Sequence, residues 1–312
     1  MGSVRKRLFF ALVLGFTIWV LASLILLPPL IVATSPNPVD EDPSSRGLAF
    51  ENILIDGEDL ALQGWWIPAA NPIAELIFVH GAGSNRVSRY IGSLDFYRTL
   101  HQLGVSIVTI DLRNHGNSPM TDGQLRMGSV EWQDLIHSAR WLDAHQTQQL
   151  PRFALGASMG GSTVIRALRE GLRVDGAILL DPQLDIYDSL VEGAEVSTGL
   201  PASLFSLAAQ VAIWRYDLPA DENAPLTLAS TLRIPILLIQ DWDDPVTRSP
   251  FAQSLAQANP QVLLARVPAI PPNAACLEYK GAWGSHVAAH PCHPEWTRAT
   301  IERFIRTISA AL

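Results

Sequence analysis

The sequence predicts an α/β domain, with a mostly parallel sheet covered by helices on both faces, behind one N-terminal transmembrane helix. Short apolar runs alternate with helical stretches from about residue 50 onward, and this alternation is typical of a parallel sheet. One apolar run, 152–155, leads into a glycine-rich turn around Ser158. Residues 1–32 contain a basic cluster and a long uncharged apolar run. These three observations carry the prediction.

Eight strands are expected. Residues 52–56 and 60–67 form a hairpin that turns at Asp56-Gly57. Six further runs are nearly all apolar, as strands buried on both faces are; these runs are 74–80, 105–112, 152–155, 177–180, 234–239 and 262–267.

Helical stretches are expected between these strands, at 89–103, 127–148, 159–171, 248–258 and 294–311. The interval 183–233 breaks the alternation, because it places about fifty residues between two strands, with helical character at 201–214. An insertion there would lie over the carboxyl ends of the strands, where such sheets place their sites. We therefore expect a small helical lid.

The N-terminus predicts a membrane anchor. Arg5-Lys6-Arg7 is followed by residues 8–27 without a charge, about the 20 residues that a helix needs to cross a bilayer. A cleaved signal peptide, the alternative, has a shorter apolar core and a small-x-small cleavage site. The basic cluster places the N-terminus in the cytoplasm and the domain outside, and we expect a bacterial inner membrane.

The expected organisation is therefore a cytoplasmic stub and anchor at 1–32, a linker at 33–49 and an α/β domain at 50–312. The linker is rich in proline, serine and acidic residues, which predicts a spacer that holds the domain off the membrane. The net charge of −8 becomes −11 without the three N-terminal basic residues. Such an acidic surface argues against a nucleic-acid partner.

The stretch Gly156-Ala157-Ser158-Met159-Gly160-Gly161 predicts a nucleophile elbow, a sharp turn between a buried strand and a helix. Its glycines leave room for the strand and helix to close around the serine. Ser158 is the expected nucleophile. The N–H of Met159 would face the oxygen of the group that Ser158 attacks.

A second oxyanion donor is expected at His80-Gly81-Ala82-Gly83, which ends a buried strand, and the N–H of Ala82 is the preferred group. An ordinary glycine-rich turn is the alternative. The expected acid follows strand 234–239, where Asp244 is the first choice and Asp243 the second. Asp181, at the end of the preceding strand, is the third choice.

The expected base is His286, on a loop before the C-terminal helix. His290 and His293 lie close to the start of that helix and are expected to cap or decorate it. The chain order Ser158, Asp244, His286 is the order of the triad in hydrolases with such an elbow. The spacing of the three histidines matches no standard zinc pattern, so no metal is expected.

With these motifs, residues 50–311 resemble the α/β-hydrolase superfamily, and most closely its membrane-anchored esterase and prolyl-oligopeptidase-like branch. The matching segments are Gly64-Trp65-Trp66-x-Pro68, His80-Gly81-x-Gly83, Asp111-x-Arg113-x-His115-Gly116-x-Ser118, Gly156-x-Ser158-x-Gly160-Gly161, Asp244-Pro245-Val246 and His286. The resemblance implies an α/β-hydrolase fold. It favours Asp244 over Asp243, because the acid of such proteins directly precedes a Pro-Val pair. It also implies that the loop with Arg113 and His115 is chiefly structural.

The expected function is a serine hydrolase that cleaves carboxylic esters or thioesters of small to medium acyl groups through an acyl-enzyme, with no cofactor. The partner is a small-molecule ester, and apolar residues of the lid would line its pocket. A peptidase of the same mechanism is the alternative, for which Glu192 and Glu195 would mark the amino-terminal site. A catalytically inactive, membrane-tethered binding protein is a third possibility.

Cys276 and Cys292 flank His286 in the sequence. They are either two small apolar residues of a reducing compartment or a disulfide that fixes the histidine loop in an exported domain.

Overall fold

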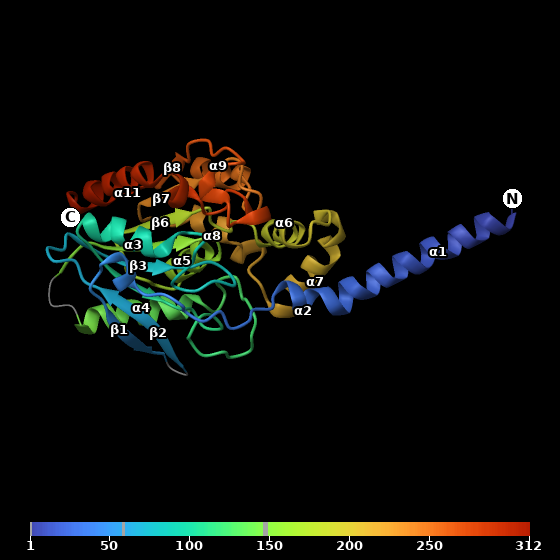
Figure 1. The fold of residues 1–312 in the computed structure, drawn as a ribbon, viewed down its shortest axis with the longest axis horizontal. Coiled ribbons are helices and arrows are strands. Elements are labelled where there is room, and N and C mark those ends of the chain that lie inside the picture. Colours follow the sequence, from blue (N-terminus) through green and yellow to red (C-terminus); the bar gives the residue numbers. More distant parts are fainter. Residues whose placement is uncertain (1, 58–59, 146–148) are drawn as a thin grey trace.

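The computed structural model describes residues 2–57, 60–145 and 149–312 (Figure 1). A single sheet holds eight strands in the order β1-β2-β4-β3-β5-β6-β7-β8. β1 and β2 run antiparallel to their neighbours, and the other strands are parallel. The expected mostly parallel eight-stranded sheet is confirmed. The strands are β1 Glu51–Asp56, β2 Ala61–Ile67, β3 Ala74–Val79, β4 Val105–Ile110, β5 Arg152–Ala157, β6 Gly176–Leu180, β7 Ile236–Gln240 and β8 Val262–Arg266.

Burial explains why the central strands read as continuous apolar runs. Every residue of β3, β4, β6 and β7 is buried, because helices cover both faces of the sheet. The edge strand β1 alternates between exposed and buried residues toward its end. The parallel register, in which Val79 pairs with Gly156 and Ala157 with Leu180, brings the carboxyl ends of β3, β5 and β6 together.

Two groups of helices cover the sheet (Figure 1). α4, α5, α8 and α9 contribute to one hydrophobic core, and α3 and α11 contribute to the other. The predicted helix at 127–148 begins at Trp132, and its expected last residues, 146–148, lie outside the described residues. The helices are α3 Ser93–Gln102, α4 Trp132–His145, α5 Met159–Arg169, α8 Pro225–Ser230, α9 Ser249–Ala258, α10 Ala289–Cys292 and α11 Pro294–Ser309.

The insertion at 183–233 forms three α-helices: α6 (Ile186–Thr198), α7 (Ser206–Tyr216) and α8. The sequence predicted helix over 201–214 but not α6. Asp185 directly precedes α6, and its side chain accepts a hydrogen bond from the N–H of Asp188. We call α6, α7 and the segment between them the lid. The lid lies between the sheet and the N-terminal helix (Figure 1).

The N-terminal helix consists of α1 (Gly2–Leu21), a π-helical turn at Ala22–Leu26 and α2 (Leu27–Ile31). Its stretch Val4–Ile31 is the one helix of the described residues that is long and apolar enough to cross a membrane. α1 projects from the domain (Figure 1). Length and composition are thus those expected of an anchor.

The linker differs from the expected spacer, because it lies along the domain. Ala33 forms a β-bridge with Gln124. Farther along, Asp40 forms an ion pair with Arg89, and Arg46 forms one with Asp95. Prolines and charged residues are typical of a free linker, but here Asp40 and Arg46 of the linker both pair with oppositely charged residues of the domain. The segment thus contacts the domain at several points, and its role as a spacer from the membrane stays a prediction.

Candidate active site

The turn after β5 holds Ser158 in a strained conformation, with φ 53° and ψ −120°. Its glycines are required by close contacts between backbone segments. A Cβ on Gly156 would lie 2.2 Å from the carbonyl oxygen of Gly160, and a Cβ on Gly160 would lie 2.4 Å from that of Val79. The strand and α5 therefore pack around the serine only because both side chains are absent.

Ser158, His286 and Asp244 form one line of hydrogen bonds. The Ser158 Oγ lies 3.0 Å from His286 Nε2, and His286 Nδ1 lies 2.8 Å from Asp244 Oδ2. Asp244 follows β7, and His286 lies in the loop before α10. All three residues are buried. The structure thus brings together the three residues that the sequence assigned to nucleophile, base and acid.

Asp244 is held as a carboxylate by several donors. Its Oδ1 accepts the N–H groups of Val246 and Thr247, and its Oδ2 accepts the Thr247 hydroxyl. Burial raises the pKa of Asp244, but the neighbouring His286 and these hydrogen bonds outweigh it, so the pKa lies below its ordinary value. The carboxylate is therefore available to accept the Nδ1–H of His286.

The two other candidate acids, Asp243 and Asp181, have different surroundings. Asp243 is exposed. Asp181 is buried and accepts the N–H groups of Asp241 and Val287. Burial, and then the charge of Asp244, hold the pKa of Asp181 well above its usual range. Among the three, only Asp244 is hydrogen-bonded to His286 in the described structure.

The loop after β3 passes directly beside the serine. A Cβ on Gly81 would lie 3.2 Å from the Ser158 Cβ, and Ala82 lines the same cavity as Ser158. Within the described residues, the N–H groups of Ala82 and Met159 make no hydrogen bond. Two unpaired N–H groups next to a serine are what a developing oxyanion needs.

His115 braces this loop from outside the site, whereas Arg113 binds a residue of α4. Arg113 forms a buried ion pair with Asp134. His115 donates from Nδ1 to the carbonyl of Arg113, and its Nε2 accepts the N–H of Gly83 at 3.1 Å. The structural role that the resemblance implied for this segment thus has a physical basis, because His115 fixes the loop of Ala82.

The remaining C-terminal histidines do not join the site. His290 is buried, stacks on Phe96 and lies 3.0 Å from the Thr99 hydroxyl. His293 directly precedes α11. The described residues contain no group of three side chains suited to hold a metal ion.

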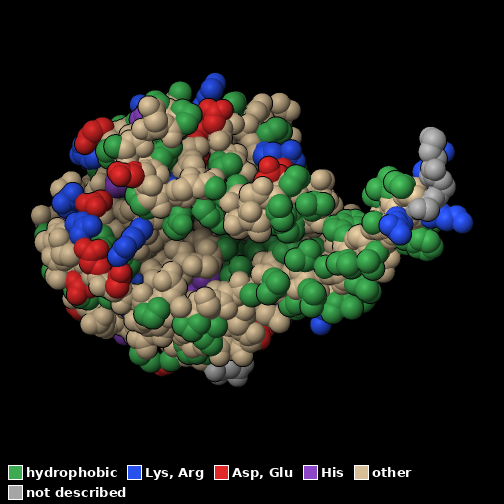
Figure 2. Space-filling model, turned by 45° about the vertical axis from the view of Figure 1, so that its right-hand side comes forward, with side chains coloured by type: hydrophobic (Ala, Val, Ile, Leu, Met, Phe, Trp, Pro, Cys, Tyr) green, Lys and Arg blue, Asp and Glu red, His purple; other side chains and the backbone are tan. Residues whose placement is uncertain are grey.

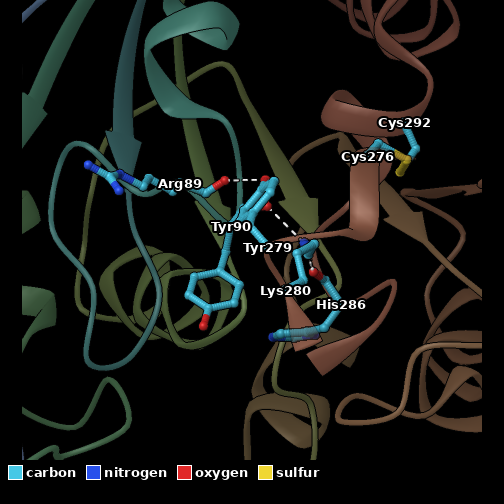
Figure 3. Close-up of a disulfide and its surroundings, with 7 residues drawn as sticks. All are labelled: Arg89, Tyr90, Cys276, Tyr279, Lys280, His286 and Cys292. Atoms are coloured by element: carbon cyan, nitrogen blue, oxygen red, sulfur yellow. Dashed lines mark hydrogen bonds between the residues drawn. A yellow bond between two sulfur atoms is a disulfide. The ribbon is translucent and has the colours of Figure 1, made fainter. Parts of the chain in front are cut away.

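Lys280 is a residue that the sequence analysis missed. Its Nζ donates to the carbonyl oxygens of Tyr90, at 2.8 Å, and His286, at 2.5 Å (Figure 3). The side chain is almost fully buried, and burial lowers its pKa from 10.5 to about 8. No local pattern marks a single lysine as buried, and one of its two partners comes from a loop 190 residues away.

The two cysteines form a disulfide that closes the segment containing Lys280 and His286 (Figure 3). Sixteen positions separate them. Close by, the Tyr279 hydroxyl donates to the carbonyl of Arg89. The histidine loop is therefore fixed covalently at its base and by hydrogen bonds to the loop of Arg89 and Tyr90.

A cavity of about 500 Å³ lies above Ser158 and His286. Figure 2 shows a hollow beside the junction of the domain and the N-terminal helix, with hydrophobic side chains around it. The apolar wall comes from the lid, from the loops and from the end of the N-terminal helix, as Leu27, Leu30, Ile31, Ile91, Leu125, Met127, Leu190, Phe205 and Val246. The described lining includes no Asp, Glu, Lys or Arg.

This sheet order, with a serine at the strained turn after a central parallel strand, defines the α/β-hydrolase class of enzymes. Comparisons with known proteins agree. Residues 70–216 match the family described as serine aminopeptidase, S33. A phospholipase of Bacillus subtilis, YtpA, is 26% identical over an alignment 212 residues long, which covers 58% of this chain and 79% of the relative.

Solved structures show the same fold. The esterase Pf2001 of Pyrococcus furiosus superposes with a TM-score of 0.70 at 21% identity, covering 88% of this chain and 99% of that one. A protein of Butyrivibrio proteoclasticus with bound ferulic acid gives a TM-score of 0.61 at 15% identity, covering 83% and 99%. The chain belongs to the α/β-hydrolase superfamily.

Proposed function

We propose that the protein is a serine hydrolase that cleaves carboxylic esters or thioesters of small to medium acyl groups. One observation carries the proposal: the line of hydrogen bonds from Asp244 through His286 to the Ser158 hydroxyl, at the floor of an apolar cavity. A serine hydroxyl is a weak nucleophile by itself, and a histidine oriented by a carboxylate activates it.

The proposed reaction has two halves. The Ser158 Oγ attacks the acyl carbon while His286 Nε2 takes the hydroxyl proton, and Asp244 stabilises the imidazolium. The N–H groups of Ala82 and Met159 stabilise the oxyanion. The proton then passes to the leaving alcohol or thiol, and water releases the acyl group from the serine by the same steps. These residues need no cofactor for this chemistry.

The apolar cavity favours an acyl group over a peptide. The phospholipase and esterase relatives support this choice, whereas the match to the serine aminopeptidase family favours the peptidase alternative. A free amino terminus would need a carboxylate in the cavity. Glu192 instead lies 3.8 Å from Arg248, and Glu195 accepts the N–H of Ala202, so neither marks such a site.

We also propose that the N-terminal helix is an uncleaved anchor and that the domain lies outside a bacterial inner membrane. The basic residues before the apolar run support a cytoplasmic N-terminus. The Cys276–Cys292 disulfide supports an oxidising compartment for the domain.

Hydrolysis of p-nitrophenyl esters, from acetate to palmitate, by the full chain in detergent tests the function. We expect turnover that is highest on short or medium chains and is abolished in Ser158→Ala. A fluorophosphonate should label the parent protein but not this variant. Folded protein that turns over no ester and takes no label would contradict the proposal and favour a silent binding protein. Labelling without ester turnover would favour a peptidase.

A further inference from the structure

The N-terminal helix forms part of the candidate active site. Leu27, Leu30 and Ile31, at the end of this helix, line the same cavity as Ser158 and His286. Given the proposed function, we propose that the substrate is the acyl ester of a glycerolipid, which enters the cavity sideways from the bilayer that holds the helix. The helix would then guide the acyl chain as well as anchor the domain.

The lid is attached to the membrane-spanning part of the helix. The Trp19 indole N–H donates to the carbonyl oxygen of Leu204, in the lid, at 2.9 Å. α7 also packs against α2 and the preceding turn. Twelve residues separate Trp19 from Ile31, about 18 Å along a helix. A hydrocarbon layer about 30 Å thick that begins at the N-terminal end of the apolar run would include Trp19. The contact with Trp19 therefore places the lid tip at the depth of the lipid headgroups or deeper in the bilayer.

The outer surface of the lid fits that position. Leu200 is 51% exposed, Leu204 41% and Trp214 82%. Large apolar side chains this exposed are costly in water but stable in the boundary layer of a membrane, where tryptophan is enriched. Hydrophobic side chains continue from the rim of the hollow onto the helix (Figure 2). The cavity therefore connects with an apolar surface that lipid would cover.

A glycerolipid fits this arrangement chemically. Its acyl chain would lie between the helix end and Phe205 of the lid, and its ester carbon would reach the Ser158 Oγ. The acyl–oxygen bond breaks, the Oγ–acyl bond forms, and the glycerol oxygen leaves with the proton from His286. Water then releases the fatty acid. A phospholipid and a monoacylglycerol share this ester, so the experiment separates them.

The test uses the full chain reconstituted in vesicles of dimyristoylphosphatidylcholine that carry 1-oleoylglycerol. Released myristate identifies the phospholipid as substrate, and released oleate identifies the monoacylglycerol. In a second arm, the protein is in one set of vesicles and the same substrate lipids are supplied in separate vesicles that contain no protein. We expect release of either acid from the shared bilayer and about tenfold less from separate vesicles. Equal rates in the two arms would overturn lateral entry.

Two substitutions at similarly exposed helix positions provide a matched pair. Leu30 is 68% exposed and lines the cavity, whereas Leu26 is 62% exposed and does not. We expect Leu30→Asp to lower the rate on vesicle lipid relative to p-nitrophenyl acetate by roughly tenfold, because a carboxylate in the wall repels the acyl chain. Leu26→Asp should leave this ratio unchanged.

The outcomes separate this inference from the proposed function. Equal effects of the two substitutions, or turnover of p-nitrophenyl acetate with no fatty acid from either lipid, would refute lipid entry along the helix and leave the serine hydrolase intact. Loss of ester turnover in the parent protein would instead contradict the proposed function.

Discussion

Gly160 and Gly193 lie in helices, and the structure predicts that the same substitution has opposite effects on them. A methyl group at Gly193, in α6, meets no atom within 4 Å. A methyl group at Gly160, in the first turn of α5, would lie 2.4 Å from the carbonyl oxygen of Val79 and 2.6 Å from that of His80. Both of these oxygens belong to the backbone and cannot rotate away.

The magnitudes follow from these surroundings. Alanine is favoured over glycine inside a helix by roughly 0.5–1 kcal/mol, so Gly193→Ala should stabilise the protein by about that amount. Overpacking in a rigid interior costs about 1–3 kcal/mol. For Gly160→Ala this cost exceeds the helix gain, and relief requires α5 to move away from β3. That movement would separate Ser158 from the loop of Ala82.

Urea unfolding of the full chain in one detergent, followed by tryptophan fluorescence, measures both effects. We expect the midpoint to fall for Gly160→Ala and to rise for Gly193→Ala, and we expect p-nitrophenyl acetate turnover to fall in the former. A Gly160→Ala protein as stable and as active as the parent would refute the argument that close backbone packing requires this glycine.

Three further predictions concern the site and the core. Lys280→Met should lower kcat about tenfold with little change in KM, because the loop of His286 loses the ammonium group that holds its backbone carbonyl. The free energy of unfolding should change little, since removal of a buried charge offsets the loss of hydrogen bonds to the carbonyls of Tyr90 and His286. Asp244→Asn should lower kcat by about 10⁴, whereas Asp243→Asn, at an exposed position, should retain parent turnover of p-nitrophenyl acetate. Burial lowers the pKa of His290 from 6.5 to about 4, so the unfolded chain takes up a proton at a higher pH than the folded chain does. The free energy of unfolding, measured with urea, should therefore fall by up to about 3 kcal/mol as the pH drops from 6.5 to 4. His290→Gln should flatten this dependence.

Much of the sheet could be predicted because burial on both faces leaves a simple mark in the sequence. Strands such as β3 and β4 are continuous apolar runs, and each predicted boundary lies within two or three residues of the observed one. The nucleophile elbow could also be predicted, because the close backbone contacts around Ser158 require glycines at fixed positions beside it. That the chain folds into an α/β hydrolase is confirmed, and the roles of Ser158, Asp244 and His286 stay predictions.

The features that the sequence did not predict depend on contacts between segments that lie far apart in the chain. An apolar run such as that ending at Leu27 favours a bilayer and a protein cavity equally, so its sequence could not indicate that the helix end lines the site. Lys280 was missed because a lysine is usually exposed, and its burial depends on the distant carbonyl of Tyr90. The path of the linker was missed because its partners, such as Arg89, lie far along the chain.

The spread of the cavity wall along the chain also has a consequence for biosynthesis. The wall begins at Leu27 and ends at Val287. In the proposed membrane-anchored hydrolase, Ser158 leaves the ribosome long before His286, so a nascent chain would carry the serine beside lipid without the base that would activate it. Only a chain that is almost finished holds every part of the proposed site, and an unfinished one would be harmless to the membrane that receives it.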